Sequence, residues 1–291
     1  MPTSTRACQV CGDAALRYRH DWLFQCDECG VLSADFPVAI PAETSDSGID
    51  EAAREAGLAE LRRRNNRKLL ATLKTLLPKG GRLLDVGAGP GFLLRAAREA
   101  GFEAEGIEPD ANVVAFARQQ GSPIRHGYFP DQLKPGETFE AIVFNDVLEH
   151  IPDLRGALSA SFRHLAPGGV LCLNCPDKRG LFFRVAAALD RLGVHGPYDR
   201  LWQRGLPSPH VWYFTPALLQ HAAVREGFES AGTARLETIE LGGLWNRIRL
   251  VKATPWPVAA ASFTFAVAVY PLARIVPSDA TAVFLRKPGG G

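Results

Sequence analysis

The stretch Asp85-Val86-Gly87-Ala88-Gly89-Pro90-Gly91 decides the fold of this chain. It directly follows the apolar run Arg82-Leu83-Leu84 and precedes a helix-like segment at 92–100. This order predicts a buried strand, a glycine turn and the start of a helix. Because glycine lacks a Cβ, a ligand at the crest of such a turn can touch bare peptide N–H groups. The turn is therefore typical of a site for a nucleoside cofactor.

Two features beside the turn indicate which of the cofactors known to bind such loops this chain would bind. A dinucleotide fingerprint has a third glycine where the helix packs on the strand, and Phe92 occupies that position. Asp85 closes the strand, where a carboxylate attracts a cationic ligand and repels a phosphate. S-adenosylmethionine carries a sulfonium and an ammonium group, whereas a dinucleotide carries two phosphates. The residues therefore favour S-adenosylmethionine.

A second predicted strand, at 103–107, ends in Glu108-Pro109-Asp110. This acid lies about twenty residues beyond the glycines, where a carboxylate can accept hydrogen bonds from both ribose hydroxyls. On its own, Glu108 would be an ordinary loop carboxylate. Combined with the glycine turn at the correct offset, it becomes the candidate ribose-binding residue.

Predicted strands and helices alternate between residues 82 and 174. We expect strands at 82–86, 103–107, 124–126, 139–144 and 169–174, and helices at 92–100, 111–120 and 154–165. Strands separated by helices of this length imply crossover connections and a parallel sheet. A helix at 217–226, capped by Thr215, and strands at 229–240 and 282–286 complete the pattern.

Four segments fall outside this alternation. Residues 31–47 are predicted to be a linker, and residues 49–77 have helical spacing with a break at Gly57. Residues 179–209 form an insertion where a lid over a cleft is expected. Residues 253–276 are almost purely apolar, but prolines interrupt them before the length of a membrane span is reached. We expect a buried cap helix there; the alternative is a surface that contacts lipid or an apolar substrate.

Two C-x-x-C-G knuckles stand near the N-terminus, Cys8-Gln9-Val10-Cys11-Gly12 and Cys26-Asp27-Glu28-Cys29-Gly30. The fourteen residues between Cys11 and Cys26 suit four thiolates that close tetrahedrally around one zinc ion. Such a site is structural, because protein ligands fill every position. The alternative is a pair of disulfides or redox dithiols, which the lack of an export signal disfavours. A third pair, Cys172 and Cys175, lies in a strand pattern that points the two thiols to opposite faces, so we expect small buried hydrophobes.

The bulk composition limits the classes of function. The 291 residues are 46% apolar, enough for one sizeable core and a smaller unit. A formal charge of +2 gives no overall field that would steer the chain to nucleic acid or an anionic membrane. Because the N-terminus lacks an apolar secretion signal, we expect a cytoplasmic protein. The sequence does not set the oligomeric state.

Two later motifs complete a family pattern: Asn145-Asp146-Val147-Leu148-Glu149-His150 after the fourth strand, and Leu165-Ala166-Pro167-Gly168-Gly169. In this order, the motifs resemble those of class I S-adenosylmethionine-dependent methyltransferases. The resemblance is close over 69–174 and extends through His210-Val211-Trp212-Tyr213-Phe214-Thr215-Pro216. It implies an α/β fold with a doubly wound, Rossmann-like and mostly parallel sheet, here joined by a small N-terminal zinc-binding module and a helical cap or insertion.

The resemblance also implies a division of the chain and a set of cofactor contacts. We expect a zinc-ribbon-like module at 1–40, a helical linker at 41–68 and the methyltransferase domain at 69–291. The glycines would line the methionine and ribose portions of the cofactor, Glu108 would hold the ribose, and Tyr128 or Phe129 would stack on adenine. The expected cofactor contacts are Asp85, Gly87, Ala88, Gly89, Gly91, Glu108, Pro109, Tyr128, Phe129, Asn145, Asp146 and Val147.

Two histidines are candidates for catalysis. Methyl transfer from a sulfonium is an in-line displacement, so a base is needed only if the acceptor must lose a proton. His150 follows the fourth strand, at the sheet edge where such folds bind ligands, and its structural alternative is a helix-start element. His210 follows the insertion, and its alternative is packing on neighbouring aromatic rings. A Mg²⁺ site formed by Asp146, Glu149 and His150 is a minor alternative.

Three classes of function are consistent with these observations. The first is methylation of an oxygen or carbon of a small molecule, such as a sugar nucleotide, a glycolipid or a natural-product intermediate. The second is an RNA or protein methyltransferase whose ribbon docks the macromolecule through charge and stacking. The third is a cofactor-binding scaffold without turnover. We expect the first, because the charge is near neutral, the insertion provides a lid and the cofactor motifs are intact.

Overall fold

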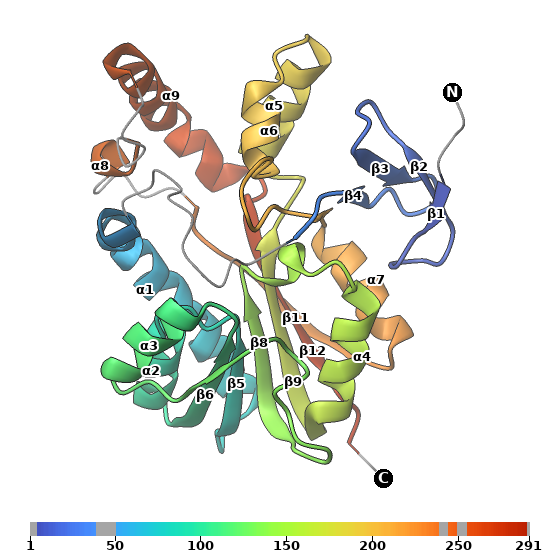
Figure 1. Ribbon diagram of the computed structural model, residues 1–291, viewed down its shortest axis with the longest axis vertical. Coiled ribbons are helices and arrows are strands. Elements are labelled where there is room, and N and C mark those ends of the chain that lie inside the picture. The colour runs from blue at the N-terminus through green and yellow to red at the C-terminus, as the bar shows by residue number, and fades with distance from the viewer. Residues whose placement is uncertain (1–4, 39–50, 239–243, 249–254, 290–291) are drawn as a thin grey trace.

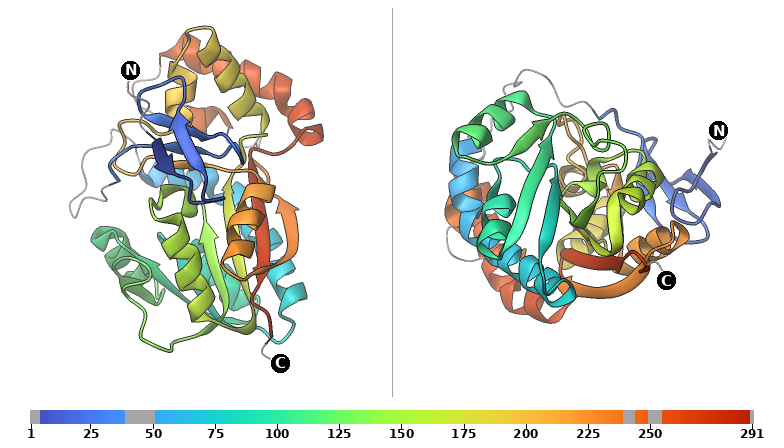
Figure 2. Two further views of the ribbon diagram at one scale, coloured as in Figure 1. Left: turned by 90° about the vertical axis from the view of Figure 1, so that its right-hand side faces the viewer. Right: turned by 90° about the horizontal axis from the view of Figure 1, so that it is seen from below.

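The computed structural model describes residues 5–38, 51–238, 244–248 and 255–289. Its strands form two sheets, with the orders β1-β2-β3-β4-β10 and β11-β12-β9-β8-β5-β6-β7 (Figure 1). The larger sheet stands at the centre of the molecule, and helices cover both of its faces. The smaller sheet lies beside one end of the larger one (Figure 2). The predicted α/β fold class is therefore confirmed.

The larger sheet is parallel except at one strand. Its members are β5 (Gly81–Val86), β6 (Phe102–Glu108), β7 (Ile124–His126), β8 (Phe139–Asn145), β9 (Leu165–Pro176), β11 (Glu229–Arg235) and β12 (Ala280–Arg286). Strand β12 pairs antiparallel with both β9 and β11. The strand order reverses between β5 and β8, which pair in parallel at the centre. Loops that leave the carboxyl ends of β5 and β8 diverge, so this point opens a crevice for a ligand.

Alternating side chains of the central strands pack into two hydrophobic cores, one on each face of the sheet. On one face Leu83 packs with α1 (Glu51–Leu76), α2 (Phe92–Glu99) and α3 (Ala111–Gln119). On the other face Leu84 packs with α4 (Leu154–His164) and α7 (Pro216–Arg225). The period of two along a strand produces this division, because successive side chains point to opposite faces. As predicted, Thr215 caps α7 by accepting a hydrogen bond from the Leu218 N–H.

Residues 5–38, here called the cysteine module, form most of the smaller sheet. Its strands are β1 (Thr5–Ala7), β2 (Ala14–Arg17), β3 (Leu23–Cys26) and β4 (Leu32–Ala34), and β4 also pairs with β10 (Trp212–Tyr213). The prediction of a linker at 31–47 is therefore wrong for β4. This strand is buried because it has a partner on each side. Residues 39–47 of the predicted linker lie outside the described residues.

The insertion at 179–209 folds into α5 (Leu181–Arg191) and α6 (Gly196–Leu201) and is joined to the cysteine module. The buried carboxylate of Asp190 lies at the joint. It is 2.7 Å from Arg19 Nη2, 2.9 Å from His20 Nε2 and 2.6 Å from His195 Nδ1. Burial raises the pKa of Asp190, but hydrogen bonds from His195 and His20 outweigh burial and lower that pKa below its ordinary value.

The apolar segment at 253–276 forms a helix but is not the buried cap that we expected. Helix α9 (Trp256–Ile275), beyond the short α8 (Leu244–Ile248), exposes many of its large side chains. Trp256 is 66% exposed and Ile275 is 82% exposed, whereas Ala259 and Ala266 are buried. The helix projects beyond the sheet (Figure 1). Its half-buried Phe263 ring packs edge-on against Trp245 of α8, with ring centroids 5.6 Å apart. Of the helices in the described ranges, none combines the length and apolar character that crossing a membrane requires.

Two predicted boundaries also differ from the structure. Helix α1 continues through Gly57 without a break, because one glycine weakens a helix by about 1 kcal/mol without ending it. Strand β11 ends at Arg235 instead of residue 240, since the chain then turns toward the end of β12, where the Leu236 N–H donates to Ala280 O. Residues 239 and 240 lie outside the described part of the chain.

Candidate active site

A cavity of about 630 Å³ lies at the carboxyl ends of β5 and β8. Its walls come from the glycine loop, the segment after β8, the middle of α1 and the end of the insertion. The structure brings nine of the predicted residues to this wall: Asp85, Gly87, Ala88, Gly89, Asn145, Asp146, Val147, His150 and His210. The cofactor and acceptor candidates therefore share one cleft.

The glycine loop requires glycine at each turn position. Gly87, Gly89 and Gly91 have φ angles of 69°, 52° and 80°, a region that residues with a Cβ rarely adopt. A Cβ on Gly87 would lie 2.6 Å from a methyl group of Val147. A Cβ on Gly89 would meet no described atom within 4 Å and would point into open space. The loop thus packs tightly on its sheet side and presents bare backbone to the cleft.

Glu108 supports this loop from the neighbouring strand. Its Oε2 accepts a hydrogen bond from the Gly89 N–H at 2.9 Å, and its Oε1 accepts one from the Asp110 N–H at 3.0 Å. Burial raises the pKa of Glu108 above its ordinary value, against the effect of these two bonds. The Glu108 carboxylate therefore lies beside the crest of the glycine turn, where a residue that binds ribose is expected.

Five expected cofactor residues do not line the cavity. Glu108 and Pro109 lie one strand away at the end of β6, and Gly91 caps α2. Tyr128 is 54% exposed, and the Phe129 ring packs edge-on against Phe144 with ring centroids 5.4 Å apart. Stacking of either aromatic ring on an adenine remains a prediction.

Several carboxyl groups in the cleft wall have raised pKa values, among them Asp85 and Asp146. Burial, and then the charge of Glu108, raises the pKa of Asp85 well above its ordinary value. Desolvation by the surrounding protein raises the pKa of Asp146 to about 6, against the charge of Arg62, although the side chain is exposed to solvent in the cleft. Asp146 has a φ of 59° and accepts a hydrogen bond from Asn174 Nδ2 at 3.0 Å. A positive φ strains the backbone of an aspartate, and such strained residues are common at functional sites.

His150 and His210 meet in the cleft wall, with ring centroids 4.7 Å apart. His150 Nδ1 lies 3.0 Å from the carbonyl oxygen of Pro209 and 3.2 Å from Ser208 Oγ. Because a carbonyl only accepts, Nδ1 carries the proton and Nε2 of the neutral ring is left as the basic nitrogen. Burial lowers the pKa of His150 below its ordinary value, against the effect of these hydrogen bonds.

Both ring nitrogens of His210 have protein partners. Its Nε2 accepts from the side-chain amide of Gln203 at 2.9 Å, and its Nδ1 lies 3.4 Å from the Tyr213 hydroxyl. That hydroxyl donates to Leu201 O at 2.8 Å, so it accepts from His210 Nδ1. Burial, and then the nearby His150, lowers the pKa of His210 to about 3. His210 is therefore a neutral, hydrogen-bonded ring.

Glu149 is a site residue to which sequence reasoning gave only a minor metal role. Its side chain is 1% exposed, and Oε2 has no hydrogen-bond partner among the described residues. Burial, and then the charge of Asp146, raises the pKa of Glu149 well above its ordinary value. One oxygen of Glu149 lies within 4.8 Å of a nitrogen of each histidine. The only sequence signal was its place between Leu148 and His150.

Several lining residues lie outside the family motifs, and sequence reasoning missed them. They come from α1, from the end of the insertion and from the segments beside β11 and β12: Leu61, Arg62, Asn65, Asn66, Gln203, Ser208, Glu237, Thr238, Asp279 and Ala280. Their positions depend on tertiary packing, which no local motif records.

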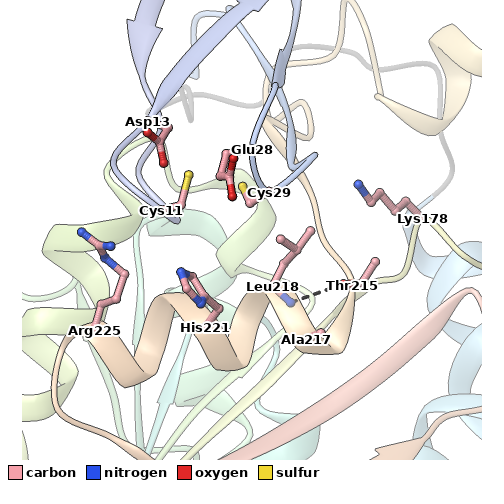
Figure 3. A pocket seen from close by; sticks show the side chains of 10 residues that line it. All are labelled: Cys11, Asp13, Glu28, Cys29, Lys178, Thr215, Ala217, Leu218, His221 and Arg225. Carbon is pink, nitrogen blue, oxygen red and sulfur yellow. Dashed lines mark hydrogen bonds between the residues drawn. The ribbon is translucent and has the colours of Figure 1, made fainter.

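The four N-terminal cysteines form one cluster. Cys8 Sγ lies 3.7 Å from Cys29 Sγ, and Cys11 Sγ lies 3.4 Å from Cys26 Sγ. Four thiolates around zinc, each with a bond of about 2.3 Å, stand about 3.8 Å apart, so the cluster fits this ion. All six cysteines of the chain are described and none forms a disulfide. The cluster faces α7 across a cavity of about 550 Å³, with His221 and Arg225 on the helix (Figure 3).

The parallel sheet, its single antiparallel strand and the glycine loop at the switch point define the class I S-adenosylmethionine-dependent methyltransferase fold. Solved structures share this fold. An S-adenosylmethionine-dependent methyltransferase from Thermotoga maritima has a TM-score of 0.54 at 16% identity and covers 82% of this chain and 95% of its own. A [4+2]-cyclase, SpnF, has a TM-score of 0.53 at 21% identity and covers 77% of this chain and 82% of its own.

The sequence model of a methyltransferase domain family matches residues 58–231. The chain therefore belongs to this methyltransferase family and is an S-adenosylmethionine-dependent enzyme. It is 38% identical over 97 residues to a ubiquinone biosynthesis O-methyltransferase of Paramagnetospirillum magneticum. The aligned residues cover 32% of this chain and 39% of that protein. It is 26% identical over 177 residues to the protein of the same name from Azorhizobium caulinodans, 58% of this chain and 66% of that one. The chain thus spans less than two thirds of the length of these relatives.

Proposed function

We propose that this enzyme methylates a small molecule at an oxygen or carbon atom. The observation that carries the proposal is a single cleft whose wall holds both bare glycine backbone and His150, with the Nδ1 proton of His150 held by Pro209 O. The names of the curated relatives, which denote O-methylation in ubiquinone biosynthesis, support a small acceptor. The α5–α6 insertion, whose end lines the cleft, supports an enclosed site from which water can be excluded.

The charges of the cleft narrow the choice of acceptor. Five carboxyl groups line the described cavity wall, at Asp85, Asp146, Glu149, Glu237 and Asp279, against one arginine, Arg62. Among its described residues such a wall offers a diphosphate a single arginine, whereas hydroxyl groups can form hydrogen bonds with the carboxyl groups whether or not these are ionised. Of the expected acceptors, a glycolipid or a natural-product hydroxyl therefore suits the cleft better than a sugar nucleotide.

The proposed cofactor half of the site binds S-adenosylmethionine and orients its methyl group. S-adenosylmethionine, when bound, supplies a methyl group on a positively charged sulfur. In the proposed arrangement Glu108 accepts from the ribose hydroxyls, and the Gly87–Gly89 backbone carries the methionine portion. A cation close to Asp85 would favour the ionised form of this buried acid, whose pKa is otherwise raised. The loop residues thus align the methyl group for in-line attack.

The acceptor half of the site removes a proton. We assign His150 as the base, because its Nδ1 proton is held by Pro209 and its Nε2 can accept the proton of an acceptor hydroxyl. The lowered pKa of His150 keeps the ring neutral, and so competent as a base, at ordinary pH. We assign His210 to positioning, because Gln203 and Tyr213 already occupy its two nitrogens.

We further propose a structural zinc ion at Cys8, Cys11, Cys26 and Cys29, in a module formed by residues 1–40 ahead of the catalytic domain. The separations of the sulfur atoms support this assignment. Atomic emission measurements should find one zinc per chain, and none in Cys8→Ser. A metal-free protein that keeps its thermal unfolding midpoint would contradict a structural zinc.

Two measurements test the proposed function. Calorimetry should detect binding of S-adenosylmethionine and of S-adenosylhomocysteine, and labelled S-adenosylmethionine should transfer its methyl to one small molecule in a metabolite extract. Label that appears only in RNA or protein, together with RNA binding that weakens steeply with salt, would instead support a macromolecular acceptor. Binding of the cofactor without any methyl transfer would support a cofactor-binding scaffold without turnover.

A further inference from the structure

The cysteine module has no core of its own. Val10, Phe24 and the buried cysteines pack into the core that contains α4 and α7. Trp22 and Leu32 pack into a second cluster with residues of α5, α6 and β10. A unit of this size buries too little apolar surface to fold alone, and here its apolar side chains complete the cores of the catalytic part. The module is therefore in a position to affect the geometry of the cleft.

The first knuckle contacts the segment that carries His150. Gln9 lies between Cys8 and Cys11, and its Nε2 donates to Pro152 O at 3.0 Å. Its Oε1 accepts from the Arg155 N–H at 3.2 Å. One side chain thus holds both ends of the turn between η1 (Leu148–His150) and α4.

The second knuckle leads into a different contact with the same segment. After Cys29 the chain forms β4, which pairs with β10 in the register Ser33 to Trp212. The Ala34 N–H donates to Val211 O at 2.9 Å. Residues 209–213, here called the strap, therefore have one edge attached to the cysteine module.

The opposite edge of the strap holds η1. The Val211 N–H donates to Glu149 O at 2.7 Å, and the Trp212 indole N–H donates to Ile151 O at 2.9 Å. At the start of the strap, Pro209 O accepts the Nδ1 proton of His150 at 3.0 Å. The strap thus connects β4 of the module directly to the imidazole.

We propose that the cysteine module positions His150, with Gln9 and Trp212 as the positioning residues. Gln9 fixes the turn that follows η1, and Trp212 keeps the strap against η1 so that the Pro209 carbonyl stays on Nδ1. The module thereby selects the tautomer in which Nε2 is the basic nitrogen. This inference deepens the proposed function, since it rests on His150 as the base. The tautomer of the His150 ring can be measured in the absence of an acceptor substrate, so the inference can be tested separately.

The test uses the full-length, zinc-loaded protein with ¹⁵N-labelled histidine. The nitrogen resonances of the His150 ring, assigned by their loss in His150→Gln, report which nitrogen carries the proton. The wild type should show the Nδ1–H tautomer. In Gln9→Ala and in Trp212→Phe, which keeps an aromatic ring but removes the indole N–H, the Nε2–H tautomer should rise about fivefold, as the loss of one hydrogen bond implies.

Two controls separate positioning from a general loss of structure. Trp256→Phe, on the exposed helix α9, should leave the His150 resonances unchanged. Calorimetry with S-adenosylhomocysteine should give a dissociation constant within twofold of wild type for every variant, because none of them touches the glycine loop. Gln9 is partly exposed, so Gln9→Ala is expected to fold even if Trp212→Phe does not.

The possible outcomes are distinct. A His150 ring that stays Nδ1–H in both variants, or that is Nε2–H in the wild type, would overturn the positioning role. A tautomer shift in both variants, combined with full turnover in His150→Gln, would retain the positioning role and overturn the assignment of His150 as the base.

Discussion

The two halves of the cleft are built in different ways. Most of the proposed cofactor half comes from residues 85–109, in which the Gly89 backbone and the Glu108 carboxylate are nineteen positions apart and share a hydrogen bond. The acceptor half combines segments that are far apart, since Gln9 bonds Pro152 across 143 positions and His150 bonds Pro209 across 59. A local motif therefore forms the first half, whereas the second forms only when the whole chain has folded.

Loss of the proposed base is expected to have the largest effect and to be confined to the acceptor half. His150→Gln should lower methyl transfer by about 10²- to 10⁴-fold, the range for removal of a general base. Transfer of labelled methyl to the acceptor found in the extract measures the rate, and calorimetry should show unchanged S-adenosylhomocysteine affinity. The control is His221→Gln, on the exposed surface of α7. Equal rates in both variants would refute the assignment.

A single methyl group should damage the cofactor half selectively. Gly89→Ala places a Cβ in the open space of the cleft and should weaken S-adenosylhomocysteine binding by about 10- to 100-fold, as loss of one or two backbone contacts would. Gly121→Ala is a matched control, because Gly121 also has positive φ and also has no described atom near its Cβ position, but lies outside the cleft. Similar affinities for the two variants would mean that no ligand approaches Gly89.

The joint between the cysteine module and the insertion should contribute to stability. Asp190→Asn removes the charge that three side chains share and should lower the free energy of unfolding at pH 7 by about 2 kcal/mol. Because the folded-state pKa lies below the ordinary 3.8, this contribution is complete above that pH and is lost as the pH falls through the folded value. Urea unfolding at several pH values measures it.

Asp199→Asn on α6 serves as the control for this joint, since Asp199 forms only a surface ion pair with Arg204. It should change the free energy of unfolding by less than about 1 kcal/mol. A loss at Asp190 no larger than the loss at Asp199 would mean that the module and the insertion are not joined through this carboxylate.

The smallest effect concerns the titration of the two histidines. Burial lowers both pKa values, so His150 should titrate below 6.5 and His210 at about 3. The neutral ring of His150, the form that accepts a proton, thus persists to a lower pH than in a free histidine. Histidine NMR measures both midpoints. A His210 midpoint near 6.5 would show that its ring is open to solvent and is also a candidate base.

The same contrast explains what could be predicted from the sequence. The glycine turn and the central strands were predictable because each shows a pattern within a few residues, and the candidate role of Glu108 was predictable from its offset of nineteen positions from Gly89. The cleft contacts of Arg62 and Gln203 were not predictable, since they depend on how α1 and the insertion pack over the sheet. The roles assigned to the site residues and the zinc ligands stay predictions until they are measured.

Two errors have the same physical origin. The sequence predicts a linker at β4 because three residues are too few to show a periodicity, whereas pairing with β3 and β10 makes this segment a strand. Helix α9 was expected to be buried because its composition is apolar, yet Trp256 and Ile275 are exposed. Composition records the preference of a segment for burial, but burial itself requires a partner surface.

The pairing of β4 with β10 has a consequence for shortened forms of the enzyme. Removal of the first forty residues would leave β10 with unpaired N–H and C=O groups along one side and would expose Trp212 and Phe214 to water. Such a fragment would retain every cofactor motif and yet be prone to self-association. An isolated catalytic domain is therefore a poor substitute for the entire polypeptide in crystallisation or in assays.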